Sequence, residues 1–94
     1  MFKELNPLLH SQLRLAVMSI LMNVDEADFV DIKNTTNSTA GNLSVQIEKL
    51  SAAGYIEVTK KFDGRKPKTS CRITQLGQRE FAAYVEALKQ YIGI

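Results

Sequence analysis

Seven basic residues lie between positions 60 and 79 of this 94-residue sequence, and a single acid, Asp63, accompanies them. That segment has a net charge of +6, whereas residues 1–59 hold four basic residues and seven acids. The seven basic residues are Lys60, Lys61, Arg65, Lys66, Lys68, Arg72 and Arg79. Ammonium and guanidinium groups gathered in one stretch create a local field that attracts an anionic partner. A simpler interpretation is that the lysines keep a sheet edge soluble.

No other group of residues has the spacing that catalysis or metal binding requires. The one histidine, His10, is expected to be structural or solvated, and the one cysteine, Cys71, cannot form an intrachain disulfide. The glycines at 38–42 and 62–67 follow no phosphate-binding fingerprint, and no cluster has metal-ligand spacing. We therefore predict no enzyme activity, no metal site and no cofactor. Whether Cys71 is redox-active stays open, because thiol reactivity depends on its pKa and access.

Length and composition indicate one globular domain, since 94 residues with 45% apolar content suit a single modest core. No apolar run approaches the ~20 residues needed to span a bilayer. The run at 15–22 is followed by acidic residues without a small-residue cleavage site. A lone cysteine suits a reducing compartment. We expect a soluble cytoplasmic protein without a membrane partner.

Apolar residues at helical spacing predict three helices before residue 56. The first, within 6–24, could be capped by Asn6 or Ser11. It has apolar residues on two sides, and such a helix is buried on both. We expect its second stripe, which runs from Leu8 to Met22, to meet another chain. A short helix follows within 24–37. The third, within 38–56, begins at Ser38 or Thr39 and ends at Gly54.

The apolar period changes from 3.6 to 2 at residue 55. Residues 55–62 and 68–74 alternate between apolar and polar, and Asp63-Gly64 is a turn signal between them. This predicts a two-stranded hairpin with a basic tip, whose apolar face must lie on the helices. Residues 75–92 then form a last helix with an apolar stripe of about two heptads. That stripe is either core or an intermolecular seam, and we favour the seam.

The predicted order is helix, helix, helix, hairpin, helix, an α+β and mainly α arrangement typical of a winged helix-turn-helix. Three stretches occur in this order: GNLS…KL…AGYIEV (41–58), F-x-GRKP-x-T (62–69) and IT-x-LG (73–77). Together they resemble single-domain winged-helix DNA-binding transcriptional regulators of the MarR/ArsR-like type. The resemblance covers residues 1–94 as one domain. It implies a homodimer with helix 75–92 in the interface, a third helix in the DNA major groove, and a wing beside it.

Binding to double-stranded DNA would then use two regions of the chain. Lys and Arg on the wing would neutralise phosphates, and Arg65 at the tip suits a narrow minor groove. On the third helix, Asn42 or Gln46 can pair with adenine, and Val45 can contact a thymine methyl. The other interpretation of these three side chains is solvated helix surface. The predicted DNA-binding residues are Ser38, Thr39, Asn42, Ser44, Val45, Gln46, Lys49, Lys61, Arg65, Lys66, Lys68 and Arg72.

The predicted dimer contacts are Leu8, Leu15, Met18, Met22, Tyr84, Leu88, Tyr91 and Ile92. An alternative function is open, because a fold does not fix its use. The weakly basic third helix and the apolar last helix also suit a protein-interaction module in a larger assembly without DNA affinity. The operator and the sign of regulation are not specified by the sequence. Control by a small-molecule effector between the dimer helices and control by expression level alone both stay open.

Overall fold

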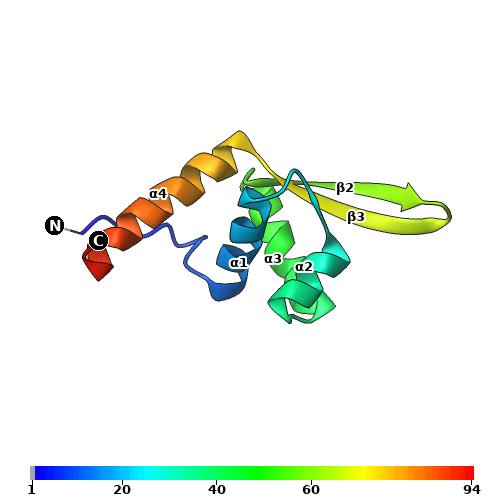
Figure 1. Ribbon diagram of the computed structural model, residues 1–94, viewed down its shortest axis with the longest axis horizontal. Coiled ribbons are helices and arrows are strands. Elements are labelled where there is room, and N and C mark those ends of the chain that lie inside the picture. The colour runs from blue at the N-terminus through cyan, green and yellow to red at the C-terminus, as the bar shows by residue number, and fades with distance from the viewer. Residues whose placement is uncertain (1) are drawn as a thin grey trace.

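The computed structural model describes residues 2–94 as four helices and a three-stranded antiparallel sheet (Figure 1). The elements in chain order are α1 (Gln12–Met22), β1 (Ala27–Asp28), α2 (Phe29–Thr36), α3 (Ala40–Ala52), β2 (Ile56–Asp63), β3 (Lys66–Ile73) and α4 (Gln75–Ile92). The predicted winged helix-turn-helix is confirmed. One correction concerns the sheet, which has three strands instead of two, because β1 pairs with β3 and places Ala27 opposite Cys71.

The molecule is elongated, with extents of 54 × 25 × 21 Å. Figure 1 shows α1, α2 and α3 gathered between two projections, with the β2–β3 hairpin on one side and α4 on the other. Both chain ends lie beside the far end of α4. The hairpin therefore projects from the helix cluster on the side away from the termini.

The core forms where the helix cluster meets the base of the sheet. The apolar face predicted for α3 is confirmed, because Leu43, Ile47 and Leu50 are all buried. Burying each such side chain contributes roughly 1.5–3 kcal/mol. The other buried members of the core are Leu9, Val17, Met18, Leu21, Ile32, Ile56, Cys71 and Tyr84.

Helix α1 begins after Ser11, the later of its two predicted caps, and not after Asn6. Asn6 closes a separate turn, because its Oδ1 accepts the Leu8 N–H at 2.9 Å and its carbonyl accepts the His10 N–H at 3.0 Å. Ser11 then adopts an extended conformation as the N-cap. Residues 6–10 therefore lead into α1 as a turn of their own.

Two residues predicted at the dimer interface lie inside the chain. Met18 has no exposed surface, and Tyr84 is only 4% exposed. The Tyr84 hydroxyl is also 2.9 Å from Nδ1 of His10. The prediction is wrong for Met18 because α1 packs against α2, α3, β3 and α4, so its second apolar stripe is partly covered within the same chain.

A tight turn joins α2 to α3 and sets the helix-turn-helix. Asn37 takes a left-handed conformation (φ 54°), and the Ser38 N–H then donates to the Lys33 carbonyl at 3.2 Å. Thr39 caps α3, since its Oγ1 accepts the Asn42 N–H at 3.1 Å. At the other end, Gly54 (φ +80°) reverses the chain into β2.

The wing is a regular hairpin whose tip is a two-residue loop. Asp63 pairs with Lys66, so Gly64 and Arg65 form the loop, and Gly64 has the positive φ (+66°) that favours glycine. From residue 57 onward every side chain of β2 is exposed. Cross-strand hydrogen bonds, rather than a core, therefore hold the outer half of the wing.

In the part of the chain that the structure describes, every helix is too short or too polar to cross a membrane.

Candidate nucleic-acid interface

The outer face of α3 lies opposite its buried stripe. With 100° per residue, Gly41, Val45, Glu48 and Lys49 point away from the core, and all four are exposed. Val45 is 48% exposed. The charges of Glu48 and Lys49 cancel, so this face has no net charge. It presents the Val45 methyl groups, with polar side chains on either flank.

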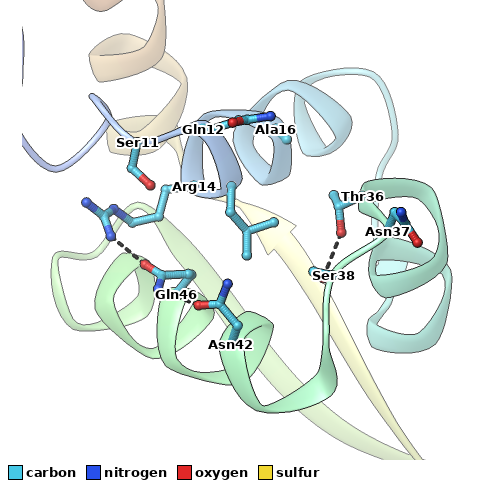
Figure 2. Close-up of a pocket in the computed structure, with 10 residues that line it drawn as sticks. Ser11, Gln12, Arg14, Ala16, Thr36, Asn37, Ser38, Asn42 and Gln46 are labelled. Atoms are coloured by element: carbon cyan, nitrogen blue, oxygen red, sulfur yellow. Dashed lines mark hydrogen bonds between the residues drawn. The ribbon is translucent and has the colours of Figure 1, made fainter.

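The flank of α3 that faces α1 carries a chain of hydrogen bonds, drawn in Figure 2. Arg14 of α1 donates through Nη1 to Oε1 of Gln46 and through Nε to the Leu8 carbonyl at 2.5 Å. Gln46 donates through Nε2 to Oδ1 of Asn42 at 3.0 Å. Arg14 was missed by sequence reasoning, because nothing in its own segment indicates a neighbour 32 residues away.

The predicted residues Ser38 and Thr39 lie at the turn before α3. Thr39 is occupied as the helix cap, and the Ser38 hydroxyl lies 2.9 Å from that of Thr36. A polar pocket of about 430 Å³ opens beside them, between α1 and the α2–α3 turn (Figure 2). Arg14, Asn42 and Gln46 line its other side.

The opposite flank of α3 faces the wing. A groove of about 640 Å³ runs between them, lined by Ser44 and Glu48 of α3 and by Val58, Lys60 and Thr69 of the hairpin. The strand register explains this set, because Lys60 pairs with Thr69 and shares a sheet face with Val58.

The remaining cations of the strands lie on the other face of the sheet. Lys61 is opposite Lys68, and Arg72 is opposite Glu57. The predicted set contains Lys61, Lys68 and Arg72 but omits Lys60, which faces α3. The period-two alternation from Val58 was the signal that could have found Lys60.

Two wing cations are already paired with acids. Both carboxylate oxygens of Glu26 accept from Lys61 Nζ, at 2.9 and 3.0 Å, and this hydrogen bond is the main cause that lowers the pKa of Glu26. Lys68 lies 3.6 Å from Asp63. Arg65 and Lys66, by contrast, form no ion pair within residues 2–94. Lys60 and Arg72 form none among these residues either, so the tip and these two strand positions hold the wing cations that are available to an anion.

Comparison with known proteins agrees with this geometry. Residues 13–92 match the protein family described as winged helix DNA-binding domain. The chain belongs to this family. MJ0432 of Methanocaldococcus jannaschii is 28% identical over 81 residues, which cover 86% of this chain and 88% of that protein.

Two solved structures place the winged-helix domain among regulators of transcription. A transcriptional regulator homologue from Pyrococcus horikoshii OT3 is 30% identical, with a TM-score of 0.86 over 92% of this chain and 85% of that one. Bacillus subtilis PadR, solved in complex with operator DNA, is 20% identical, with a TM-score of 0.70 over 80% of this chain and 48% of its own. The PadR likeness shows the shared fold. The fold of this protein is therefore that of winged-helix DNA-binding transcriptional regulators.

The winged-helix domain keeps its one thiol in the core. Cys71 has no exposed surface, and burial, with a smaller contribution from the charge of Asp28, raises its pKa to about 11. At neutral pH the thiol is protonated and inaccessible, so this geometry does not support a redox sensor. Within residues 2–94, no three His, Cys, Asp or Glu side chains gather as a metal site.

An apolar groove of about 390 Å³ lies between α1 and α4, away from the wing. Leu15 lines it from α1, and Tyr84 and Leu88 line it from α4. Farther along α4, Tyr91 and Ile92 are exposed. Of the other predicted dimer contacts, Met22 is exposed, and Leu8 is partly buried against the core.

Proposed function

We propose that this protein is a homodimeric transcriptional regulator that binds double-stranded DNA in a sequence-specific way. In this proposal, α3 enters the major groove with Val45 and Asn42 toward the base edges. The wing follows the phosphate backbone, and Arg65 at its tip reaches the adjoining minor groove. The observation that carries the proposal is the common position of α3 and the wing, which border one groove. The wing projects from there away from the termini (Figure 1).

Affinity for DNA and recognition of its bases depend on different side chains of the interface. Phosphate neutralisation by Lys and Arg supplies most DNA affinity, whereas contacts with base edges supply specificity. The unpaired cations Arg65 and Lys66 suit the first task. The neutral outer face of α3, with its amides and the Val45 methyl groups, suits the second. The likeness of fold to PadR, a protein solved with its operator, supports DNA as the partner.

The proposed dimer would join two such units through the groove between α1 and α4. Leu15 and Leu88 lie there, and the exposed Tyr91 and Ile92 extend the apolar surface along α4. A second copy of the chain would cover these side chains by two-fold symmetry. A two-fold dimer reads half-sites about one helical turn of DNA apart, which predicts a pseudo-palindromic operator.

The DNA half of the proposal is tested by removing the cations of the wing tip. An Arg65→Ala/Lys66→Ala variant should bind all duplex sequences more weakly, and its slope of log K against log salt should fall by about 2 per protomer. The charge-matched control is Lys3→Ala/Lys89→Ala, at the opposite end of the molecule. Fluorescence anisotropy at several salt concentrations measures both slopes. Equal slopes for the tip variant and the parent would contradict the proposed role of the wing.

The dimer half is tested by sedimentation. A Leu15→Glu/Leu88→Glu variant should be monomeric at concentrations where the parent is a dimer, because charges in the groove would have to be desolvated. Ile94→Glu is the control, since this residue is 81% exposed at the chain end. A parent that is monomeric, or that binds no duplex at low salt, would favour the alternative of a protein-interaction module.

A further inference from the structure

Arg14 fixes the direction of the hydrogen bonds along the flank of α3. A guanidinium group carries only donors, so the Gln46 atom that faces it must be the acceptor Oε1. The Gln46 Nε2 group must then face Asn42, and Asn42 must accept with Oδ1. The polarity of both amides therefore follows from one residue on a different helix, as Figure 2 shows.

Arg14 is itself held in place. Its Nε donates to the Leu8 carbonyl, in the turn that precedes α1. It is half-buried between α1 and α3, whereas Asn42 at the end of the chain of bonds is exposed. The chain of hydrogen bonds therefore begins at a fixed cation in the body of the protein and ends at an amide on the surface.

We infer that Arg14 is a positioning residue for sequence recognition, which makes Asn42 present its N–H donors to the DNA. This inference rests on the proposed function. With Oδ1 engaged by Gln46, the hydrogens of Nδ2 are the polar groups of the Asn42 side chain that have no partner within residues 2–94. The preferred partner is a hydrogen-bond acceptor on the major-groove edge, such as guanine O6 or N7, rather than the donor–acceptor pair of adenine that a free asparagine selects.

These hydrogen bonds affect specificity because they fix the orientation of the Asn42 amide before DNA binds. A free asparagine amide rotates and can satisfy a donor or an acceptor with similar ease. An amide whose oxygen is held by Gln46 keeps a second lone pair, but its orientation is fixed, so it cannot turn that oxygen toward a donor elsewhere without breaking the bond. A base that presents a donor at this position is therefore disfavoured, although Arg14 touches no base.

Two substitutions break the chain of bonds at different links. Arg14→Lys keeps the positive charge but loses Nε and with it the anchor on the Leu8 carbonyl, so the group that orients the Gln46 amide is itself no longer fixed. Gln46→Glu keeps the pair with Arg14 but can only accept from Asn42, so the second link is reversed and Asn42 must donate to it with Nδ2. Gln12→Ala is the matched control, on the same helix and beside the same pocket, without a side-chain hydrogen bond in the structure.

The experiment selects bound sequences from a random duplex pool and measures affinities for the selected and an unrelated duplex at one salt concentration. For Arg14→Lys and Gln46→Glu, the ratio of the two affinities should fall by about 5- to 150-fold, the size of one specific contact. At one position of each half-site, the selected sequences should lose their preference for Arg14→Lys and change it for Gln46→Glu, in which the Asn42 amide is reversed. Relaxation of the side-chain NH₂ groups by NMR, in the free proteins, should show Asn42 ordered in the parent and mobile in Arg14→Lys.

The outcomes separate the inference from the function on which it rests. A uniform loss of affinity with unchanged base preference would make Arg14 a phosphate contact and overturn the inference. An ordered Asn42 amide in Arg14→Lys would overturn it as well. A parent that binds no duplex overturns the proposed function and the inference together, and the free-protein NMR result then stands as a structural fact only.

Discussion

Helix α3 and the wing border the same groove, yet they are built on opposite physical principles. Three buried side chains, a Thr39 cap and the Gly54 reversal fix α3, and its outer face is close to neutral. The outer half of the wing has no buried side chain, and two cations without an ion pair among residues 2–94, Arg65 and Lys66, lie at its tip. The element that core packing fixes most firmly, α3, therefore carries little net charge. In the proposed complex, α3 supplies a fixed geometry for reading bases, and the wing supplies the charge that gives affinity for DNA.

Core truncation is the largest effect that separates the two regions. Leu43→Ala should lower the free energy of unfolding by about 2–5 kcal/mol, because it opens a cavity at a fully buried position. Phe62→Ala, near the wing tip, should change it by less than about 0.5 kcal/mol, since Phe62 is 75% exposed. Urea unfolding of both variants provides the measurement. A Phe62→Ala cost equal to that of Leu43→Ala would mean that the wing tip packs against the body.

The same contrast explains how much of the fold the sequence could predict. Helix α3, the hairpin and α4 are local patterns, so their period, the Asp63-Gly64 turn and the helix end at Gly54 predict them nearly to the residue. Strand β1 has two residues and no period of its own, so only its partner β3 reveals it. For α1 the sequence could not choose between the caps Asn6 and Ser11, because only the structure shows that the Asn6 side chain closes a turn that competes with the helix.

Predicting the candidate site was limited by contacts between distant residues. The residues of α3 and the wing could be named, because helical geometry and charge point to them directly. The pairing of Lys61 with Glu26 spans 35 residues, and no local pattern contains it. Met18 was assigned to the wrong surface for a related reason, since a stripe shows that a face is apolar but not which chain covers it.

The next largest expected effect is a pH dependence of the free energy of unfolding, which arises from Cys71 at the junction between the wing and the core. Its pKa is about 11 in the folded protein against an ordinary value near 9.0, so the folded state favours the protonated thiol. The stabilising contribution is complete below pH 9 and is lost as the pH rises from 9 to 11. Over that window the free energy of unfolding should fall by about 1.4 kcal/mol per pH unit.

The control for this pH dependence is Cys71→Ala, which has no thiol to ionise. Its unfolding free energy should start lower because of the smaller side chain, and it should fall less steeply between pH 9 and 11. Lysine and tyrosine groups titrate in the same range in both proteins, so the difference between the two slopes isolates the thiol. Parallel curves would contradict a raised pKa at the base of the wing.

A glycine on the outer face of α3 provides a smaller effect with opposite signs for stability and binding. No atom lies within 4 Å of a methyl group added at Gly41, so Gly41→Ala should stabilise the fold by about 0.5–1 kcal/mol. The same methyl group would stand between α3 and the floor of the major groove, and we expect weaker DNA binding. Thermal unfolding and anisotropy on one sample check both signs. Tighter binding by this variant would mean that DNA does not approach this face.

The smallest effect concerns the acid that already holds a wing cation. A phosphate must compete with Glu26 for Lys61, and the carboxylate also repels the DNA backbone. Glu26→Gln removes both penalties, so we expect DNA binding to tighten about two- to five-fold and the salt slope to steepen by up to about 0.9. Because the pKa of Glu26 is lowered, the acid is ionised throughout the range from pH 6 to 8, and the gain should not vary across it.

Helix α4 supplies the matched control for that substitution. Glu86 pairs with Lys89 at 3.0 Å, so Glu86→Gln removes the same charge and the same kind of ion pair at the end of the molecule away from the wing. Its DNA affinity should stay close to that of the parent. An equal gain in both variants would show that net charge alone sets the affinity, and the division between an accurate helix and a charged wing would then lose its basis. A gain confined to Glu26→Gln would place Lys61 among the phosphate contacts, on the sheet face turned away from α3.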